Sequence, residues 1–245
     1  MSKVYIFDVD GTLTPSRQKM TKEFEEFFGE WALKNTFYLV TGSDLLKLQE
    51  QMNGMEYHSS GIFTCCGNEF WQVDPAVHPK HADNIYSNKF KPSDELLKYL
   101  EDTLDDSDYP VKAGIHIEDR GSMLNFSMVG RKCTLQERKN YFEYDNLTGE
   151  RQSIAKYIRE NWKDIDAVIG GQISIDIYPK GNDKSQILDV IKQERLVQPD
   201  EYIFIGDRTM EGGNDYPLAK LMEKTNNCSY YQTTGPEETQ KILEK

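Results

Sequence analysis

A chain of 245 residues, 38% hydrophobic and 29% charged, has the composition of a folded protein and enough length for one large domain or two modest ones. Its formal net charge of −12 argues against nucleic-acid binding, which needs a basic surface, so any bound phosphate must be met by local cations. No apolar run approaches the ~20 residues of a membrane span, and the four cysteines form no CxxC pair, so we expect a cytoplasmic protein without disulfides, zinc or membrane attachment.

The first 60 residues predict alternating strands and helices. An apolar run predicts a strand over residues 3–8, and aromatic side chains at helical spacing predict a helix from about Thr21. A second apolar run over residues 36–40 is followed by Ser43, which we expect to cap the next helix. The order strand, helix, strand, helix is typical of a parallel α/β sheet.

Between about residues 84 and 181 the pattern changes. A helix with Ser93 as its N-cap precedes two alternating runs, VKAGIHIE and MLNFSMVG. A helix near residues 151–161 then precedes the run ISIDIYP, in which Ser174 and Asp176 share one side of the expected strand. Strands that follow one another without intervening helices are typical of an antiparallel α+β unit.

After Gly181 the first pattern returns. The expected elements are a helix over residues 183–194, a strand YIFIG over residues 202–206 and helices near residues 215–224 and 236–244. The sequence therefore predicts an α/β core with a parallel sheet between helices, made of residues 1–83 and 182–245. It also predicts an inserted α+β domain with an antiparallel sheet over residues 84–181.

Carboxylates follow two strands of the expected core. Asp8 and Asp10 end the first strand in FDVDGTLT, and Asp207 ends the strand YIFIG. Ligands bind at the carboxyl ends of parallel strands, and carboxylate oxygens are preferred ligands of Mg²⁺. We expect Asp8, Asp10 and Asp207 to form a magnesium site, in which the cation neutralises the repelling carboxylates. The alternative is that Asp8 and Asp10 only form a turn with Gly11.

Other polar residues suit a phosphate. Thr41 and Ser43 follow the second strand and offer hydroxyls beside a helix start, where backbone N–H groups attract anions. Lys184 lies in the first turn of a helix capped by Asn182 or Asp183, where a lysine is unfavourable to the helix dipole. A bound phosphate explains that position, whereas a solvated surface lysine is the ordinary alternative. We expect Asn214 or Asp215 to cap the following helix.

Four motifs occur in an order that resembles a known family. They are FDVDGTLTPSRQK, GSMLNFSMVGR, GGQISIDIYPKGNDKSQ and FIGDRTMEGGND. The chain resembles the haloacid dehalogenase superfamily and, within it, the eukaryotic-type phosphomannomutases. The resemblance implies a Rossmann-like haloacid dehalogenase core, a substrate-binding cap over residues 84–181 and a homodimer formed through the cap. It also implies interconversion of mannose 6-phosphate and mannose 1-phosphate through a hexose 1,6-bisphosphate activator, in GDP-mannose biosynthesis.

The resemblance also implies a role for each matching residue. Asp8 is the expected nucleophile that forms an aspartyl-phosphate, Asp10 the general acid/base, and Lys184 the partner of the transferring phosphoryl group. Mg²⁺ is expected on Asp8, the main-chain carbonyl of Asp10 and Asp207. The remaining substrate contacts implied are Arg17 in the core and Arg120, Arg131, Arg138, Ser174 and Asp176 in the cap, the arginines holding the phosphate that is not reacting.

Some positions depart from the family pattern. Thr41 stands where the family has glycine, as in sugar phosphatases of the same superfamily, and the segment after Asp215 lacks the family's residues for a second ion. A magnesium-dependent sugar-phosphate phosphatase, in which water attacks the aspartyl-phosphate, is therefore the alternative activity. A third hypothesis, a non-catalytic protein that binds sugar phosphates, fits poorly with intact Asp8, Asp10 and Lys184.

Overall fold

The structure, a computed structural model, describes residues 2–74 and 81–245, which fall into two units. The core unit contains residues 1–87 and 182–245, and the cap unit contains residues 88–181. The boundary expected at residue 84 falls inside a strand of the core, β5 (Ala82–Ser87). The expected fold class is confirmed: one unit holds a mostly parallel sheet between helices, and the other holds a separate antiparallel sheet.

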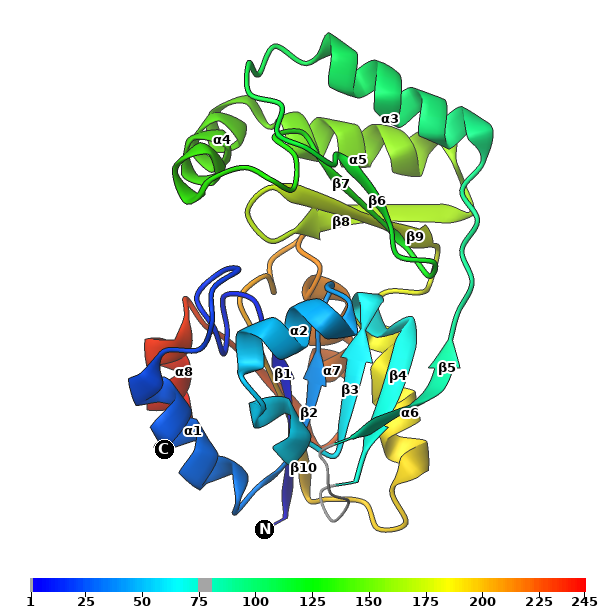
Figure 1. The fold of residues 1–245 in the computed structure, drawn as a ribbon. Coiled ribbons are helices and arrows are strands. Elements are labelled where there is room, and N and C mark those ends of the chain that lie inside the picture. Colours follow the sequence, from blue (N-terminus) through cyan, green and yellow to red (C-terminus); the bar gives the residue numbers. More distant parts are fainter. Residues whose placement is uncertain (1, 75–80) are drawn as a thin grey trace. The chain divides into compact units, whose positions relative to one another are not determined.

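The core sheet has seven strands in the order β11-β10-β1-β2-β3-β4-β5 (Figure 1). The strands are β1 (Lys3–Asp8), β2 (Thr36–Val40), β3 (Gly61–Thr64), β4 (Glu69–Val73), β5, β10 (Glu201–Gly206) and β11 (Cys228–Gln232). The first three strands of the chain, β10 and β11 run parallel, whereas β4 and β5 are antiparallel additions that the sequence analysis did not anticipate. Strand β1 lies between β10 and β2, so segments from both ends of the core's sequence form its centre.

Helices cover both faces of this sheet because the strand side chains alternate. Phe7 packs with α1 (Lys22–Ala32). The rings of Phe28 and Trp31 in this helix lie edge-on to the Phe7 ring, with centroid distances of 5.7 and 5.5 Å. Helices α2 (Leu45–Met52) and α8 (Pro236–Leu243) contribute to the same cluster. On the other face, Ile6 packs with α6 (Ile187–Glu194) and α7 (Tyr216–Lys224). Each fully buried aromatic or aliphatic side chain contributes about 1.5–3 kcal/mol, which fixes the strand ends that carry the site.

The cap unit contains a four-stranded antiparallel sheet in the order β6-β7-β9-β8. Its strands are β6 (Ile117–Asp119), β7 (Leu124–Ser127), β8 (Ile165–Gly170) and β9 (Ser174–Pro179), and its helices are α3 (Asp94–Asp106), α4 (Leu135–Thr148) and α5 (Glu150–Asn161). The three helices pack on one face of this sheet (Figure 1) and share one apolar cluster with it. Helix α4 and strand β8 were not anticipated, and most of the run VKAGIHIE lies outside β6.

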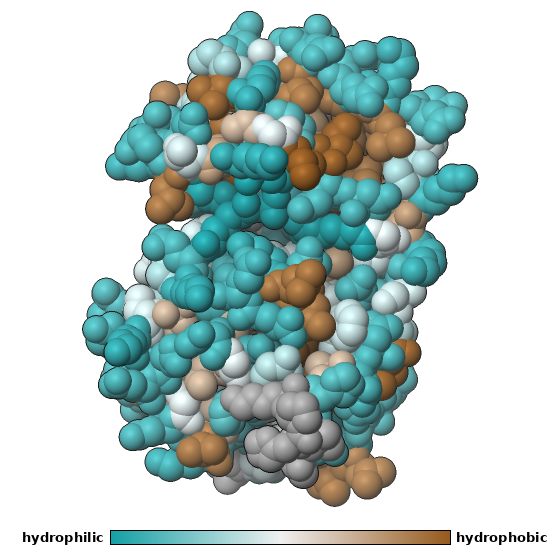
Figure 2. Space-filling model, viewed as in Figure 1, coloured by the Kyte–Doolittle hydropathy of each residue, from teal (hydrophilic) through white to brown (hydrophobic). Residues whose placement is uncertain are grey.

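The surface of both units agrees with the acidic, polar composition. Figure 2 shows a visible face that is mostly hydrophilic, with small hydrophobic patches on each unit. Within residues 2–74 and 81–245, none of the helices combines the length and the apolar character that crossing a membrane requires.

Candidate active site

Three carboxylates of the core converge at the ends of neighbouring strands. Asp8 is the last residue of β1, Asp207 follows β10, and Asp215 precedes α7. One carboxylate oxygen from each lies within 4.8 Å of the others. Because β1 and β10 pair in parallel, with Phe7 opposite Ile205, their carboxyl ends bring Asp8 and Asp207 together.

Lys184 joins two of these carboxylates. It lies in a short 3-10 helix, η3 (Lys184–Gln186), and its Nζ donates to Asp8 Oδ1 at 2.6 Å and to Asp215 Oδ1 at 2.7 Å. The lysine is fully buried, so the interpretation as a solvated surface residue is wrong. Asp183, one of the two expected caps, accepts from the Ser185 N–H at 2.8 Å and starts this turn.

Asp215 is a site residue that the sequence analysis missed. It stands at the N-cap position of α7, but its side chain caps nothing there. Its Oδ2 instead accepts from the backbone N–H of Arg208 at 2.9 Å, while Oδ1 accepts from Lys184. The expectation of a capping residue is therefore wrong for Asp215. The signals in the sequence were its position eight residues after Asp207 and its place at the end of the motif FIGDRTMEGGND, but an aspartate before a helix is equally typical of a cap.

The electrostatics of this cluster favour a divalent cation. Burial raises the pKa of Asp8 to about 7 against the opposing charge of Lys184, and burial together with the charges of Asp8 and Asp215 raises the pKa of Asp207 to about 8. Burial alone would lower the pKa of Lys184, but the charges of Asp215 and Asp8 raise it well above its ordinary value. Three carboxylates face the Lys184 ammonium and the Arg208 guanidinium, whose Nε lies 3.5 Å from Asp207 Oδ2, so an excess of negative charge remains. An all-oxygen donor set of this kind fits Mg²⁺.

The Asp10 carboxylate is not one of the three grouped carboxylates, but, in addition to burial, its charge contributes to the raised pKa of Asp8. Strand β1 ends at Asp8, and Asp10 enters a loop in which Gly11 has φ +90°. Asp10 Oδ1 accepts from the backbone N–H of Arg17 at 2.5 Å and from Gln51 Nε2 at 3.0 Å. The loop itself approaches the cluster closely, since a Cβ on Gly11 would lie 2.6 Å from Asp207 Oδ2.

Thr41 and Ser43 lie directly after β2 and are both buried. Thr41 Oγ1 accepts from the Ser43 N–H at 3.0 Å, so this hydroxyl is engaged within its own turn. The prediction that Ser43 caps α2 is wrong, because the Asp44 side chain is the cap and accepts from the Lys47 N–H at 2.8 Å. The Ser43 hydroxyl is thereby left for another partner.

The sheet of the cap unit carries a separate cluster of buried polar side chains. Ser174 and Asp176 of β9 pair in register with Ser127 and Asn125 of β7, and all four are buried. Asn125 Nδ2 donates to Asp176 Oδ1 at 2.7 Å. Asn125 and Ser127 were missed, although their spacing of two in MLNFS is the same signal that identified Ser174 and Asp176.

Two of the predicted arginines meet beside this polar face. Arg131 Nη1 lies 3.4 Å from Ser174 Oγ, and Arg131 Nη2 lies 3.4 Å from Glu118 Oε2. Arg120 pairs with the same glutamate. The side chains of Arg120 and Arg131 are only 5% and 11% exposed, which argues against unrelated surface arginines.

The remaining two arginines differ in setting. Arg138 lies on α4, is buried, and donates from Nε to Gln172 Oε1 at 2.8 Å. Arg17 belongs to the core, where it follows the loop after β1 with φ 57°. The contact between Arg17 and Asp10 is made by the Arg17 backbone N–H, which donates to Asp10 Oδ1.

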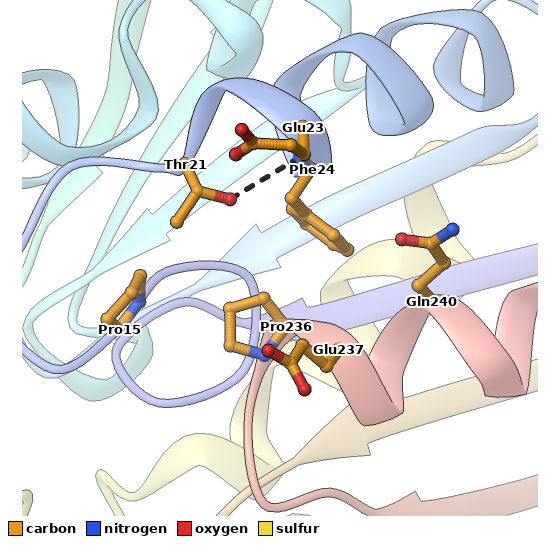
Figure 3. A pocket seen from close by; sticks show the side chains of 7 residues that line it. All are labelled: Pro15, Thr21, Glu23, Phe24, Pro236, Glu237 and Gln240. Atoms are coloured by element: carbon orange, nitrogen blue, oxygen red, sulfur yellow. Dashed lines mark hydrogen bonds between the residues drawn. The ribbon is translucent and has the colours of Figure 1, made fainter.

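A cavity of about 350 Å³ in the core lies elsewhere, at the starts of α1 and α8 (Figure 3). Pro15, Phe24 and Pro236 give it apolar walls, and Glu23 and Glu237 add carboxylates. None of the predicted site residues lines it. A phosphate ester would meet two negative charges there, so this cavity does not suit a sugar phosphate.

Comparison with known proteins places the chain in a family. The family model for eukaryotic phosphomannomutase matches residues 24–245. A phosphomannomutase of Encephalitozoon cuniculi is 37% identical over 88% of this chain and 83% of its own length. A phosphomannomutase of Drosophila melanogaster is 35% identical over 97% and 92% of the two chains.

Solved structures agree at the level of the fold. A haloacid dehalogenase-like hydrolase from Bacteroides thetaiotaomicron superposes with a TM-score of 0.60 at 14% identity, covering 100% of this chain and 99% of its own. An IMP-bound IMP-nucleotidase of Plasmodium falciparum gives a TM-score of 0.64 at 18% identity, covering 99% of this chain and 67% of its own. The fold is thus shared with haloacid dehalogenase-like enzymes, and the sequence matches are what separate this chain from them: it belongs to the eukaryotic phosphomannomutase family.

Proposed function

We propose that this protein is a phosphomannomutase that interconverts mannose 6-phosphate and mannose 1-phosphate through an aspartyl-phosphate and a hexose 1,6-bisphosphate. Family membership supports the activity, and one observation supports the assignment of the site. The Lys184 ammonium bridges Asp8 and Asp215, while Asp207 offers an oxygen within 4.8 Å of both carboxylates. A carboxylate suited to act as nucleophile, a cation and carboxylates suited to hold a metal thus lie together at the carboxyl ends of β1 and β10, which supports this assignment.

The core residues then divide the chemistry. A carboxylate oxygen of Asp8 attacks the phosphorus of the bisphosphate, and the bond from phosphorus to the sugar oxygen breaks. Asp10 gives a proton to that leaving oxygen, and in the return step it takes a proton from the attacking sugar hydroxyl. Lys184 and the Thr12 hydroxyl, which donates to Asp8 Oδ2 at 3.1 Å, hold the nucleophile in place.

Asp8, Asp207 and the main-chain carbonyl of Asp10 would hold Mg²⁺. When bound, the ion withdraws negative charge from the phosphoryl oxygens. The donor chemistry fits, because the cluster combines several carboxylate oxygens with a single buried ammonium. Asp215 completes the group of three carboxylates, and its two oxygens accept from Lys184 and from the backbone N–H of Arg208.

Arginine side chains are proposed to bind the second phosphate of the sugar, the one that is not reacting. Arg120, Arg131 and Arg138 of the cap, together with Arg17 of the core, are proposed to grip the phosphate that is not reacting. A guanidinium can bind a phosphate through two parallel hydrogen bonds. Ser174 and Asp176 are proposed to contact the sugar hydroxyls, and Thr41 and Ser43 the transferring phosphoryl group.

The decisive measurement is ³¹P NMR of mannose 1-phosphate with the protein and Mg²⁺, with and without a catalytic amount of hexose 1,6-bisphosphate. Appearance of mannose 6-phosphate, accelerated by the bisphosphate, supports the mutase. Inorganic phosphate as the main product shows instead a sugar-phosphate phosphatase. An unchanged spectrum under both conditions contradicts the proposed function.

The assembly and location are also proposals. A homodimer through the cap is supported by apolar side chains that the cap leaves exposed, Ile115, Leu135 and Leu147. Light scattering should give twice the chain mass for the wild type and the monomer mass for Leu147→Glu if Leu147 lies in the contact. A cytoplasmic location is supported by four cysteines that are all free.

A further inference from the structure

Gln51 is a buried residue of α2 that contacts the proposed general acid/base. The side chain is 1% exposed, and its Nε2 donates to Asp10 Oδ1 at 3.0 Å and to Thr14 Oγ1 at 3.3 Å. Its backbone carbonyl accepts from the Met20 N–H at 2.9 Å. Gln51 therefore connects α2 to the irregular segment that follows β1 through three hydrogen bonds, two made by its side chain and one by its backbone.

These contacts make the two oxygens of Asp10 different. Oδ1 accepts from two N–H groups, those of Gln51 Nε2 and the Arg17 backbone. Within residues 2–74 and 81–245, no group donates a hydrogen bond to Oδ2. The carboxyl group is therefore held by one oxygen, and the other is left to exchange a proton with the substrate. A loop carboxylate without such donors would rotate about its terminal torsion, which is broad.

The carbonyl oxygen of the Gln51 side chain argues against the idea that this residue only fills space in the core. Its Oε1 is buried and has no hydrogen-bond partner within the described residues. A buried acceptor without a partner costs free energy, which an apolar side chain of the same length would avoid. The stability of the core thus does not require an amide at this position, whereas orientation of Asp10 does.

We infer that Gln51 is a positioning residue for Asp10: its Nε2 occupies Oδ1, so that Oδ2 is directed to the oxygen that gains or loses the proton. The inference rests on the proposed function, in which Asp10 transfers that proton. It assigns a role in turnover to a helix residue that belongs to none of the four sequence motifs. The contact is made wholly within the core unit.

The test is a double-mutant cycle between Gln51 and Asp10. The rate of Asp8 phosphorylation by hexose 1,6-bisphosphate is measured by rapid quench in four proteins: wild type, Gln51→Met, Asp10→Asn and the double variant. Methionine keeps the length of glutamine and removes the donor. We expect Gln51→Met to lower the rate by about 10- to 100-fold in the wild-type background, the size of a small misplacement of a reacting group. In the Asp10→Asn background, the same change should alter the rate by less than about two-fold, because non-additivity marks residues that act as one unit.

The matched control is Gln49→Met, two residues away on the same helix. Gln49 Nε2 donates to the Tyr57 hydroxyl and contacts no site residue, so this variant should keep the wild-type rate. Gln51→Glu supplies a second test if Gln51→Met fails to fold. It has the shape of glutamine but places an acceptor against Asp10, and its rate should fall at least as far.

The outcomes separate the inference from the proposed function. A wild type that is not phosphorylated, or an Asp10→Asn variant as fast as the wild type, contradicts the proposed function itself. If those two behave as proposed, equal losses from Gln51→Met in both backgrounds show a structural role only and overturn the inference. A Gln51→Met variant as fast as the wild type overturns it as well.

Discussion

The ammonium of Lys184 lies 2.7 Å from the carboxylate of Asp215, and neither side chain has any exposed surface. The same ammonium lies 2.6 Å from Asp8 Oδ1. A buried cation with two carboxylate partners holds segments from three parts of the core sequence at one point. The pair therefore contributes both to the stability of the core and to the charge balance of the site.

Removing the Lys184 ammonium should lower the free energy of unfolding of the core. Lys184→Met leaves Asp8 and Asp215 buried without their counter-ion, and breaking a buried pair in this way costs about 3–5 kcal/mol. Urea denaturation of the metal-free protein should show this loss. Lys220→Met removes an exposed lysine paired with Glu223 and should leave the midpoint nearly unchanged. Equal midpoints for the two variants would contradict a structural role of the Lys184 bridge.

Asp8→Asn should abolish phosphorylation while keeping the fold. An amide is not a nucleophile toward phosphorus, whereas Lys184 retains Asp215 as a partner. After mixing with ³²P-labelled hexose bisphosphate, acid-quenched wild type should carry label and Asp8→Asn none, with similar circular dichroism. Asp189→Asn, an exposed position on α6, should be labelled like the wild type. Label retained on Asp8→Asn would assign the nucleophile elsewhere.

Mg²⁺ should raise the thermal midpoint through Asp207. A ligand at 100 times its dissociation constant stabilises the folded protein by about 2.7 kcal/mol, which is a shift of several degrees. Asp207→Asn should lose this shift because it removes a charged donor from the cluster. Glu211→Gln, a nearby exposed position, should keep it. A full magnesium shift in Asp207→Asn would exclude this carboxylate as a ligand.

Arg131→Met should weaken the response to the bisphosphate activator. Charged hydrogen bonds of the kind a guanidinium makes contribute about 1.5–3 kcal/mol, so the activator concentration for half-maximal turnover should rise about 10- to 100-fold. Asp8 phosphorylation by a monophosphate should change less. Arg159→Met, an arginine of α5 that donates to the Ala167 carbonyl, is the control in the same unit. Equal losses with both substrates would show that Arg131 does not hold the distal phosphate.

Gly11→Ala should damage the site beyond its effect on stability. Gly11 has φ +90°, and a Cβ there would lie 2.6 Å from Asp207 Oδ2. Gly149→Ala is the matched control, because Gly149 also has positive φ but no atom within 4 Å of a new Cβ. Both variants should lose about 1–2 kcal/mol from backbone strain. Only Gly11→Ala should also lose turnover and magnesium binding, and comparable turnover in the two would contradict the close approach.

Local sequence signals predicted the first four elements of the core, β1, α1, β2 and α2, but not β3, β4 or β5. Strands β1 and β2 have the expected bounds because unbroken apolar runs leave little ambiguity, and α1 starts after Thr21 because a threonine cap and aromatic spacing agree. Helix α4 escaped prediction because its polar residues lie on all sides, and some of its buried residues, Arg138 and Asp145, are charged. Such a helix is recognisable only by what it packs against.

The site was predictable only in part, for a related reason. Asp8, Asp207 and Lys184 follow from strand ends and an unusual lysine, which are local features. The roles of Asp215 and Gln51 are set by partners that lie 31 and 41 residues away, respectively, in sequence. No spacing rule relates such distant positions, so an aspartate beside a helix start reads as a cap, and a glutamine on a helix reads as surface.

The central place of β1 between β2 and β10 has a consequence for biosynthesis. A ribosome releases Asp8 early, but Lys184, Asp207, Asp215 and the neighbouring strand β10 emerge only after the cap segment. The cap, being contiguous, can fold while one edge of β1 still lacks its neighbour. Until β10 has been synthesised, in the last quarter of the chain, one edge of the apolar strand β1 therefore stays unpaired. An unpaired strand edge of this kind can pair with the wrong strand.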